Sequence, residues 1–503
     1  MTTLQTIKWL VRDRRRRLYF LQKQDDNFYR KENIMLAELY TVTPRIVPAD
    51  TMSELTVRGN FPHSDFRIFS GDIVVETVGP DGLFANGDLP GYTCGNGFDM
   101  KRPWFEPIPV EIDAAGIMRI KYYFRGEGEC IFRIRIGERV LYTFHTYAVR
   151  HEWLKLRPFR GDLHLHSGYS GCCGQKELLS PEYYAIVNRA AGMDFISISD
   201  HKQHYPSLKA QDFISQCGGD FQVYPSEEVH LPDLHTIHNL NFGGNVSISD
   251  RLFRGNPEFD ALLAKYLKVV PDFKDEYLRY LAACYHVVAD MIHDAGGVNI
   301  FCHPFWRPFD RLFLPRCVRD YVCEKQIFDA VELFGHGERN ADETHALYSD
   351  LCIACGKRIP AVGNNDAHNV GDIGIHLTVI WAERNEFPAL RDALLANMNV
   401  VVSTYPGEIH RTSGTLELVS FYHFLRENYY PRHDALCSSE ADLMYAALAS
   451  GTPDTDYDRV THLPYAERIG KIMDYKKLKF APDTAALSAQ KAKIAALEAE
   501  FWG

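Results

Sequence analysis

Two histidines separated by a single residue, His164 and His166, stand in the segment Asp-Leu-His-Leu-His-Ser that begins at Asp162. In a β-strand, residues two positions apart point to the same face. The two imidazoles are therefore predicted to face one cavity, while Leu163 before them and Leu165 between them enter a core. Such a pair at a strand end is a common way to present two nitrogen ligands to a metal ion, although pairs of this kind also arise by chance.

More histidines and carboxylates follow later in the chain, each at the end of a predicted strand or just beyond it. In α/β barrels the functional residues gather at the carboxyl ends of the strands. Mixed imidazole and carboxylate ligands suit Zn, Mn or Fe better than Mg or Ca, and so many ligands exceed the needs of one tetrahedral ion. We therefore expect two or three divalent ions, which could activate a bridging water and clamp a phosphoryl group. The predicted ligands are His164, His166, His201, Glu228, His238, His303, Asp366 and His368.

The elements that must position these residues alternate between strand and helix from residue 160 to about 405. Segment 180–191 fits a helix with Ser180 as its N-cap, Pro181 in the first turn and Gly192 at its end. A short apolar strand follows at 194–201 and ends in Asp-His. Repeated strand–helix alternation predicts an α/β fold with a parallel sheet or barrel.

Five motifs in this region resemble those of the PHP (polymerase and histidinol phosphatase) family. The resemblance covers about residues 158–405 and implies a distorted seven-stranded (β/α) barrel that carries up to three metal ions. It also implies phosphoester hydrolysis, since members include histidinol-phosphate phosphatases, nucleotide phosphatases and exonuclease domains of bacterial DNA polymerases. The motifs are Asp-Leu-His-Leu-His-Ser, Ser-Asp-His at 199–201, Ser-Glu-Glu-Val at 226–229, Cys-His-Pro-Phe at 302–305 and Asn-Asp-Ala-His at 365–368.

The family pattern leaves alternatives at some positions. Glu228 matches the bridging glutamate, with Glu227 as its competitor, and His238 matches the next histidine, with His235 as its competitor. Family members usually carry an aspartate or histidine ligand soon after the first motif, where this chain has Gly-Cys-Cys at 171–173. Cys172 could replace that ligand, but we favour a loop cysteine without a ligand role. This departure puts the third metal position in question.

Residues for phosphate binding and proton transfer are less well defined by the sequence. Arg307 is predicted to hold a substrate phosphate, and His204 to protonate the leaving oxygen. Surface or structural roles are the competing interpretation of both. Lys202 is a second candidate for the substrate phosphate, and Arg339 is a further option; Glu332 near a strand end could be structural, and His336 just beyond it has no assigned role.

The remaining segments differ in character from the predicted barrel. Residues 1–35 are expected to form a helical segment, and the period-two alternation of 36–150 predicts a β-sandwich. Residues 406–503 are expected to form a helical extension. The predicted organisation is thus 1–35, 36–150, 158–405 and 406–503.

Composition limits the function further. The 503 residues are 46% hydrophobic and carry a net charge of −11, with 12 cysteines in no regular disulfide spacing. No run of apolar residues is long enough for a transmembrane helix, and no apolar segment follows the arginines at 14–17, so a cytoplasmic protein is expected. The acidic balance favours a phosphorylated small molecule over a nucleic acid as substrate.

Metal-dependent hydrolysis of a small phosphomonoester, such as a nucleotide or sugar phosphate, by a metal-bridging hydroxide is therefore the predicted function. A phosphodiesterase or nuclease acting on a larger substrate is one alternative. A non-catalytic metal-binding scaffold is another, and hydrolysis at carbon is less favoured because no metal-bridging lysine signature is evident.

Overall fold

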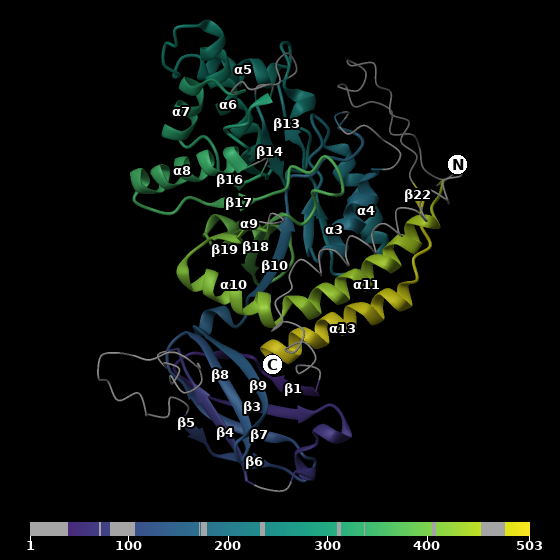
Figure 1. Cartoon of the computed structure of the whole chain (residues 1–503). Coiled ribbons are helices and arrows are strands. Elements are labelled where there is room, and N and C mark those ends of the chain that lie inside the picture. The colour runs from purple at the N-terminus through teal and green to yellow at the C-terminus, as the bar shows by residue number, and fades with distance from the viewer. Residues whose placement is uncertain are drawn as a thin grey trace. The chain divides into compact units, whose positions relative to one another are not determined.

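The computed structural model describes residues 39–69, 72–80, 106–170, 172, 179–231, 237–308, 313–335, 338–404, 409–453 and 478–503 (Figure 1). The predicted N-terminal helical segment 1–35 lies outside these residues. The chain divides into two compact units. The first comprises Met1–Leu154 with Glu498–Gly503, and the second comprises Lys155–Leu497.

Two β-sheets that share one core form the first unit. Period-two alternation is visible in β8, where Cys130, Phe132 and Ile134 are buried and their neighbours are more exposed. The rings of Phe132 and Phe144 stack with centroids 5.0 Å apart at the centre of this core. All neighbouring strands are antiparallel except β2 and β9. The strand order of one sheet is β1 (Tyr40–Thr43), β3 (Thr51–Gly59), β7 (Met118–Phe124), β6 (Val110–Ile112). The strand order of the other sheet is β2 (Ile46–Pro48), β9 (Arg139–Val149), β8 (Gly128–Ile136), β4 (Ile73–Val78), β5 (Glu106–Ile108).

The second unit confirms the predicted mixed α/β class, with strands and helices alternating along the chain. One sheet has six strands, in the order β12 (Gln222–Tyr224), β11 (Phe195–Ser197), β10 (Arg157–Asp162), β18 (His376–Ala382), β19 (Asn399–Ser403), β20 (Arg411–Ser413). The other has five, in the order β13 (Glu228–Val229), β14 (Asn239–Phe242), β15 (Val298–Phe301), β16 (Ala330–Phe334), β17 (Ala361–Gly363).

The strands are only partly parallel, in contrast to the parallel arrangement predicted. β10, β11 and β12 are parallel, as are β15, β16 and β17. β18 pairs antiparallel with β10, and β14 is antiparallel to both β13 and β15. Isolated bridges from Leu165 to Ala367 and from His201 to Glu228 join the two sheets where the predicted ligands lie.

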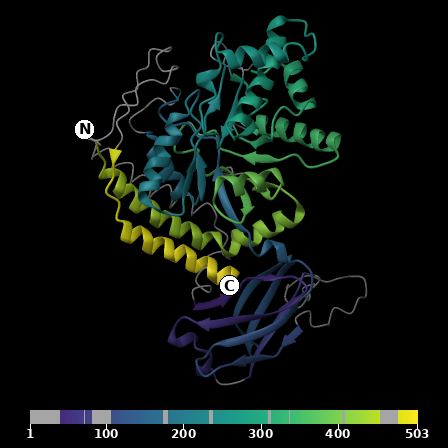
Figure 2. The same cartoon turned by 180° about the vertical axis from the view of Figure 1, so that it is seen from behind.

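The helices of the second unit cover the strands. The predicted helix at 180–191 is confirmed as α3 (Pro181–Ala190), with the Ser180 hydroxyl accepting the Tyr183 N–H as its N-cap and Gly192 following at φ 88°. The yellow-green helix α11 of Figure 2 packs against α3. The other helices of four or more residues in the described parts of the chain are α4 (Tyr205–Cys217), α5 (Pro257–Tyr266), α6 (Glu276–Asp294), α7 (Arg316–Glu324), α8 (Glu338–Cys355), α9 (Phe387–Leu395), α10 (Leu416–Asn428), α11 (Tyr430–Ala449) and α13 (Thr484–Trp502), of which the last residues of α13 belong to the first unit.

The helices in the described part of the chain include none that is both long and apolar enough to cross a membrane.

Candidate metal centre

The first ligand pair lies where β10 has just ended. His164 and His166 are both fully buried, and the backbone around them is held against Ala367. The His166 N–H donates to the Ala367 carbonyl at 2.9 Å. This pairing fixes the extended backbone that places both imidazoles on one side, and it brings the segment of Asp366 alongside them.

Glu228 lies at the centre of the predicted ligands. Its carboxylate is fully buried, and its oxygens are 2.6 Å from His201 Nδ1 and 2.7 Å from His238 Nδ1. Three more predicted ligands approach the same carboxylate less closely. Their Nε2 atoms are 3.6 Å (His164), 3.5 Å (His166) and 3.4 Å (His303) from its oxygens.

The neighbouring Glu227 points to the other side of its segment, as residue alternation along an extended chain requires. Its carboxylate accepts hydrogen bonds from the Ile248 N–H and from the Ser247 hydroxyl, the latter at 3.1 Å. Glu227 therefore stabilises a loop, and of the two competing glutamates the structure brings only Glu228 to the histidines. The competing His235 lies outside the described residues.

His238 reaches the site from the opposite direction to that predicted. It directly precedes β14, whereas the sequence placed the polar residues at the carboxyl ends of strands. β14 runs antiparallel to β15, so that Asn239 pairs with Phe301. The amino end of β14 therefore meets the carboxyl end of β15, next to His303.

Asp366 joins the site from the segment that follows β17. Its Oδ1 lies 2.9 Å from His166 Nε2 and 3.4 Å from His164 Nε2. Both Asp366 and His303 have positive φ angles, 48° and 21°. Non-glycine residues adopt this region at an energetic cost, which is tolerated mainly at functional sites. His368 is half-buried and its Nδ1 lies 2.8 Å from the Asp366 carbonyl.

These donor atoms fit divalent metal ions. Several groups of potential ligand atoms have all members within 4.8 Å of one another, and three of them each combine three of the predicted ligands around His164 and His166. Although they are buried, His164 Nε2 and both oxygens of Glu228 make no hydrogen bond of good geometry within the described residues, despite the short distances from Glu228 to His201 and His238. Buried polar atoms normally have hydrogen-bond partners, so their convergence marks a place for a cation. The groups are His164–His166–Glu228, His164–His303–Asp366 and His166–Cys172–His201–His368.

Two of the predicted ligands have pKa values that favour the protonation states in which they bind metal ions. Burial opposes ionisation of Glu228, but His238 and His201 outweigh it and hold the pKa of this carboxyl well below its usual range. Burial, reinforced by His201, lowers the pKa of His166 to about 3. At neutral pH these two ligands are thus a carboxylate and a neutral imidazole, the forms that bind metal ions.

Further carboxylates orient the histidines from behind. His164 Nδ1 lies 2.8 Å from the buried Glu332, leaving its Nε2 toward the centre of the site. A carboxylate behind a ligating histidine fixes its tautomer and raises its basicity. Asp200 acts through Ser170, whose hydroxyl donates to it at 2.6 Å and lies 2.9 Å from His166 Nδ1.

His230 is a buried histidine of the site that sequence reasoning missed. Its Nε2 is 3.3 Å from the Glu228 carboxylate and 3.1 Å from His201 Nδ1. It follows Glu228 by two residues, so both side chains share one face of the extended segment. The same spacing that singled out His164 and His166 could have identified it.

Cys172 lies beside the site, whereas the sequence favoured a loop cysteine without a ligand role. The residue is exposed, yet its sulfur is within 4.8 Å of a nitrogen of His166, His201 and His368. Gly171 and Cys173 lie outside the described residues.

The two residues predicted to act directly on the substrate are engaged elsewhere. Arg307 Nη2 donates to both carboxylate oxygens of Glu343, at 3.0 and 2.9 Å. His204 is buried at the start of α4, with its Nε2 2.8 Å from the Gly244 carbonyl. Neither belongs to the three groups of ligand atoms around His164 and His166. His336 and the side chain of Arg339 lie outside the described part of the structure.

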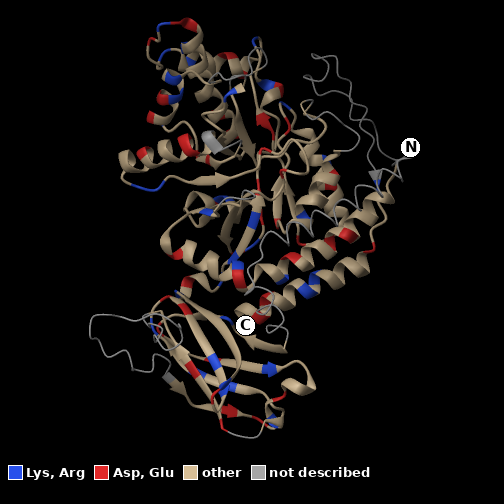
Figure 3. Ribbon diagram, viewed as in Figure 1, with Lys and Arg blue, Asp and Glu red and all other residues tan. Residues whose placement is uncertain are grey.

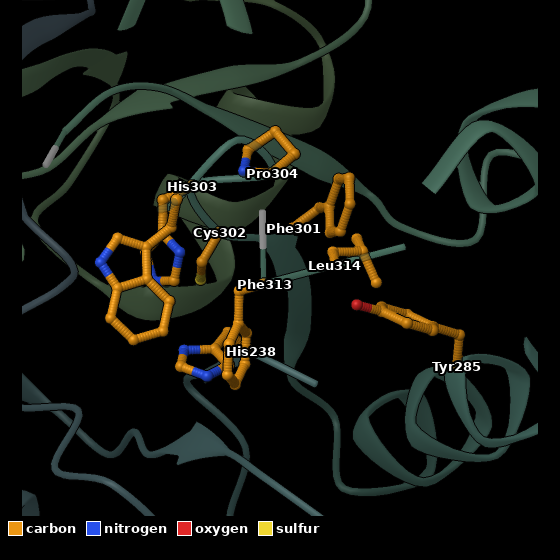
Figure 4. Close-up of a pocket in the computed structure, with 9 residues that line it drawn as sticks. His238, Tyr285, Phe301, Cys302, His303, Pro304, Phe313 and Leu314 are labelled. Atoms are coloured by element: carbon orange, nitrogen blue, oxygen red, sulfur yellow. The ribbon is translucent and has the colours of Figure 1, made fainter. Parts of the chain in front are cut away.

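A small pocket borders the site on one side. Figure 4 shows His238 and His303 on one wall and Tyr285 and Leu314 on the other. The ring of Trp306 lies 5.2 Å from that of His238, centroid to centroid. The lining is mostly apolar, so it shields the imidazoles of these two predicted ligands from water.

Comparison with known proteins gives only distant similarity. No protein-family model and no curated protein matches the chain. A two-domain protein of Bacteroides vulgatus ATCC 8482 containing a predicted PHP-like metal-dependent phosphoesterase is 13% identical, with a TM-score of 0.33 over 49% of this chain and 65% of that one. PsfC from Pseudomonas syringae PB-5123 is 16% identical, with a TM-score of 0.30 over 54% of this chain and 99% of that one.

The Lin-41 filamin domain is 12% identical, with a TM-score of 0.15 over 23% of this chain and 95% of that one. The chain thus spans less than two thirds of the Bacteroides protein. Similarity at this level assigns the chain to no family, and the chemistry of the site rests on its own residues.

Proposed function

We propose that this chain is a metal-dependent phosphoesterase of PHP type, with residues 158–405 forming its catalytic domain. One observation carries the proposal: buried nitrogen atoms from several separate segments surround the single carboxylate of Glu228. Asp366 adds a second carboxylate to the same histidines.

A distorted seven-stranded barrel is part of the proposal. The bridge from Leu165 to Ala367 links β10 to the end of β17, and that from His201 to Glu228 links the end of β11 to β13. With β14, β15 and β16 between them, these contacts support a ring of seven strands whose sheets meet at the metal ligands.

The residues of the site would have different roles in the reaction. When bound, two or three divalent ions of Zn, Mn or Fe would supply positive charge that activates water and stabilises the phosphoryl oxygens. Glu228 and Asp366 would hold the ions together with the His164–His166 pair. Glu332 keeps His164 in the tautomer that can bind an ion, and Trp306 and Phe313 exclude water beside His238.

A small phosphomonoester, such as a nucleotide or sugar phosphate, is the proposed substrate class. The net charge is −11, and Lys and Arg are interspersed with Asp and Glu along the ribbons in Figure 3. This distribution offers little bulk attraction for a nucleic-acid backbone. Arg307 could contact a substrate phosphate only after exchanging its contact with Glu343, and His204 only after leaving Gly244.

The test combines metal content with turnover. The full chain is purified without chelator, supplied with Mn²⁺ or Zn²⁺, and assayed on p-nitrophenyl phosphate and bis-p-nitrophenyl phosphate. We expect metal-dependent turnover, faster on the monoester, that His303→Ala abolishes. His63→Ala, an exposed histidine of the first unit, is the matched control and should retain it.

Two outcomes would contradict the proposal. If the reconstituted chain binds no metal, the ligand assignment is wrong. If it binds metal but hydrolyses neither ester, the phosphoesterase assignment fails for these substrate classes. If it hydrolyses the diester faster than the monoester, the proposed substrate class changes to a phosphodiester.

A further inference from the structure

One group of potential ligands contains sulfur and no carboxylate. It consists of His166, Cys172, His201 and His368, whose ligand atoms all lie within 4.8 Å of one another. Two groups around His164 include Glu228 or Asp366, and another joins His164 to Cys302 and the carboxylate of Glu332. The site therefore offers two chemically different environments side by side, one rich in oxygen and one of nitrogen and sulfur.

The histidine shared between these environments is committed to the carboxylates. His166 Nε2 is 2.9 Å from Asp366, and its Nδ1 is 2.9 Å from the Ser170 hydroxyl. His201 contacts Glu228 through Nδ1 at 2.6 Å, so it would join a separate position through Nε2, together with His368 and Cys172. Three protein ligands with a fourth place open to water or substrate is the usual arrangement of a catalytic zinc ion.

The segment that carries Cys172 is anchored close to these histidines. Ser170, two residues earlier, donates its hydroxyl to Asp200 at 2.6 Å and accepts the His201 N–H at 3.0 Å. These bonds connect Ser170 directly to Asp200 and to His201, one of the candidate ligands. The nearness of the thiol to His201 thus follows from the local backbone.

We propose that Cys172 is a sulfur ligand of a metal position completed by His201 and His368, and that this position prefers Zn²⁺ to Mn²⁺. Thiolate is a soft ligand that favours zinc, whereas Mn²⁺ favours oxygen ligands. The inference rests on the proposed function, because the ion would belong to the same catalytic site. The position with Cys172 would prefer Zn²⁺, whereas the groups that contain Glu228 or Asp366 give no reason for such a preference.

The experiment uses Co²⁺ as a spectroscopic probe in the full chain stripped of metal and reloaded. Thiolate bound to Co²⁺ gives an intense charge-transfer band in the near ultraviolet, which imidazole and carboxylate ligands do not give. We expect this band in the natural chain and in Cys317→Ser, whose exposed cysteine lies on α7. Cys172→Ser should lose it, and Cys172→His should bind Co²⁺ without it.

Zinc affinity gives a second readout. Loss of a residue that only supports a metal ligand costs about 10- to 100-fold in affinity. Loss of a direct ligand should therefore weaken Zn²⁺ binding by about 100-fold or more at one position, with a smaller effect on Mn²⁺. Cys172→His should restore most of the zinc affinity, which also controls for folding.

The outcomes separate this inference from the proposed function. Ester hydrolysis without a charge-transfer band, or a band that survives Cys172→Ser, would overturn the sulfur ligand and leave the phosphoesterase standing. A band that depends on Cys172 in a chain without turnover would keep the metal position and refute the phosphoesterase. Absence of any Co²⁺ or Zn²⁺ binding would refute both.

Discussion

Replacing Glu332 by glutamine tests whether a carboxylate outside the ligand groups of Glu228 and Asp366 controls the metal centre. Glu332 is buried and its Oε2 lies 2.8 Å from His164 Nδ1, while His164 Nε2 is 3.4 Å from Asp366. Burial alone would lower the pKa of His164, but Asp366 and Glu332 raise it well above its usual value. Glutamine keeps the shape of the side chain and removes the charge, so the imidazole becomes a weaker ligand.

The magnitude follows from the cost of losing such a supporting group. We expect metal affinity to fall about 10- to 100-fold, which corresponds to about 1.4 to 2.7 kcal/mol. Because glutamine fills the same volume, no cavity forms, and the metal-free chain should retain its fold by circular dichroism. A glutamine that donates to His164 Nδ1 would place the proton on Nε2, where it blocks metal binding, and the loss would approach the upper value.

The assay is a competition titration of the metal-free chain against a chelating dye with Zn²⁺ and Mn²⁺. Glu258→Gln, which removes a carboxylate paired with Arg251 outside the site, is the control and should bind normally. Glu228→Gln should lose far more affinity than Glu332→Gln. If Glu332→Gln binds both ions as tightly as the natural chain while Glu228→Gln does not, the supporting role of Glu332 is refuted.

Three further predictions concern stability. Glu227→Gln should lower the free energy of unfolding by about 1.5–3 kcal/mol, since its carboxylate accepts hydrogen bonds from a loop; its metal content, measured by elemental analysis, should not change, and a loss would place Glu227 among the ligands. Gly243→Ala should lower the thermal midpoint, because Gly243 has φ 77° and a Cβ would collide with the ring of Phe387; an unchanged midpoint would argue against this packing. Burial would raise the pKa of Asp194, but the neighbouring His433 holds that pKa below its usual value. Burial would lower the pKa of His433, but Asp194 raises that pKa well above its usual value. The stabilisation that Asp194 adds to the free energy of unfolding is therefore present above about pH 4 and is lost as the pH falls. The stabilisation that His433 adds is present below about pH 6.5 and is lost as the pH rises. Urea unfolding across this range should show greatest stability between these values, and Asp194→Asn should cost about 3–5 kcal/mol and flatten the acid side; an unaltered acid side would contradict the pairing.

The sequence predicted the mixed α/β class of the second unit and eight of the residues that the structure brings together, but not His230. Spacing was informative because a local pattern decides which side a residue faces. His164 and His166 lie together for this reason, and Glu228 and His230 share the same relation. Glu227 could not be separated from Glu228 by residue type, since the choice depends on which face the strand turns inward.

Strand direction was not predictable from the same information. A short apolar strand has the same pattern whether it pairs parallel or antiparallel, so β14 and β18 were expected to run with their neighbours. The role of Glu332 likewise depends on contacts with His164, 168 positions away in the chain. Long-range contacts of this kind leave no local signal in composition or periodicity.

A contact within the first unit limits the order in which the parts of the chain can fold. The residue just before its strand β2 is bonded to the last helix of the unit, because the Arg45 N–H donates to the Phe501 carbonyl at 2.9 Å. The Arg45 guanidinium also lies over the fully buried Phe501 ring. On the ribosome, the sheets emerge first but this contact must wait until the second unit has been synthesised. The first unit therefore reaches its final packing late, and a tag or truncation at residues 498–503 would act on a sheet encoded at the opposite end of the sequence.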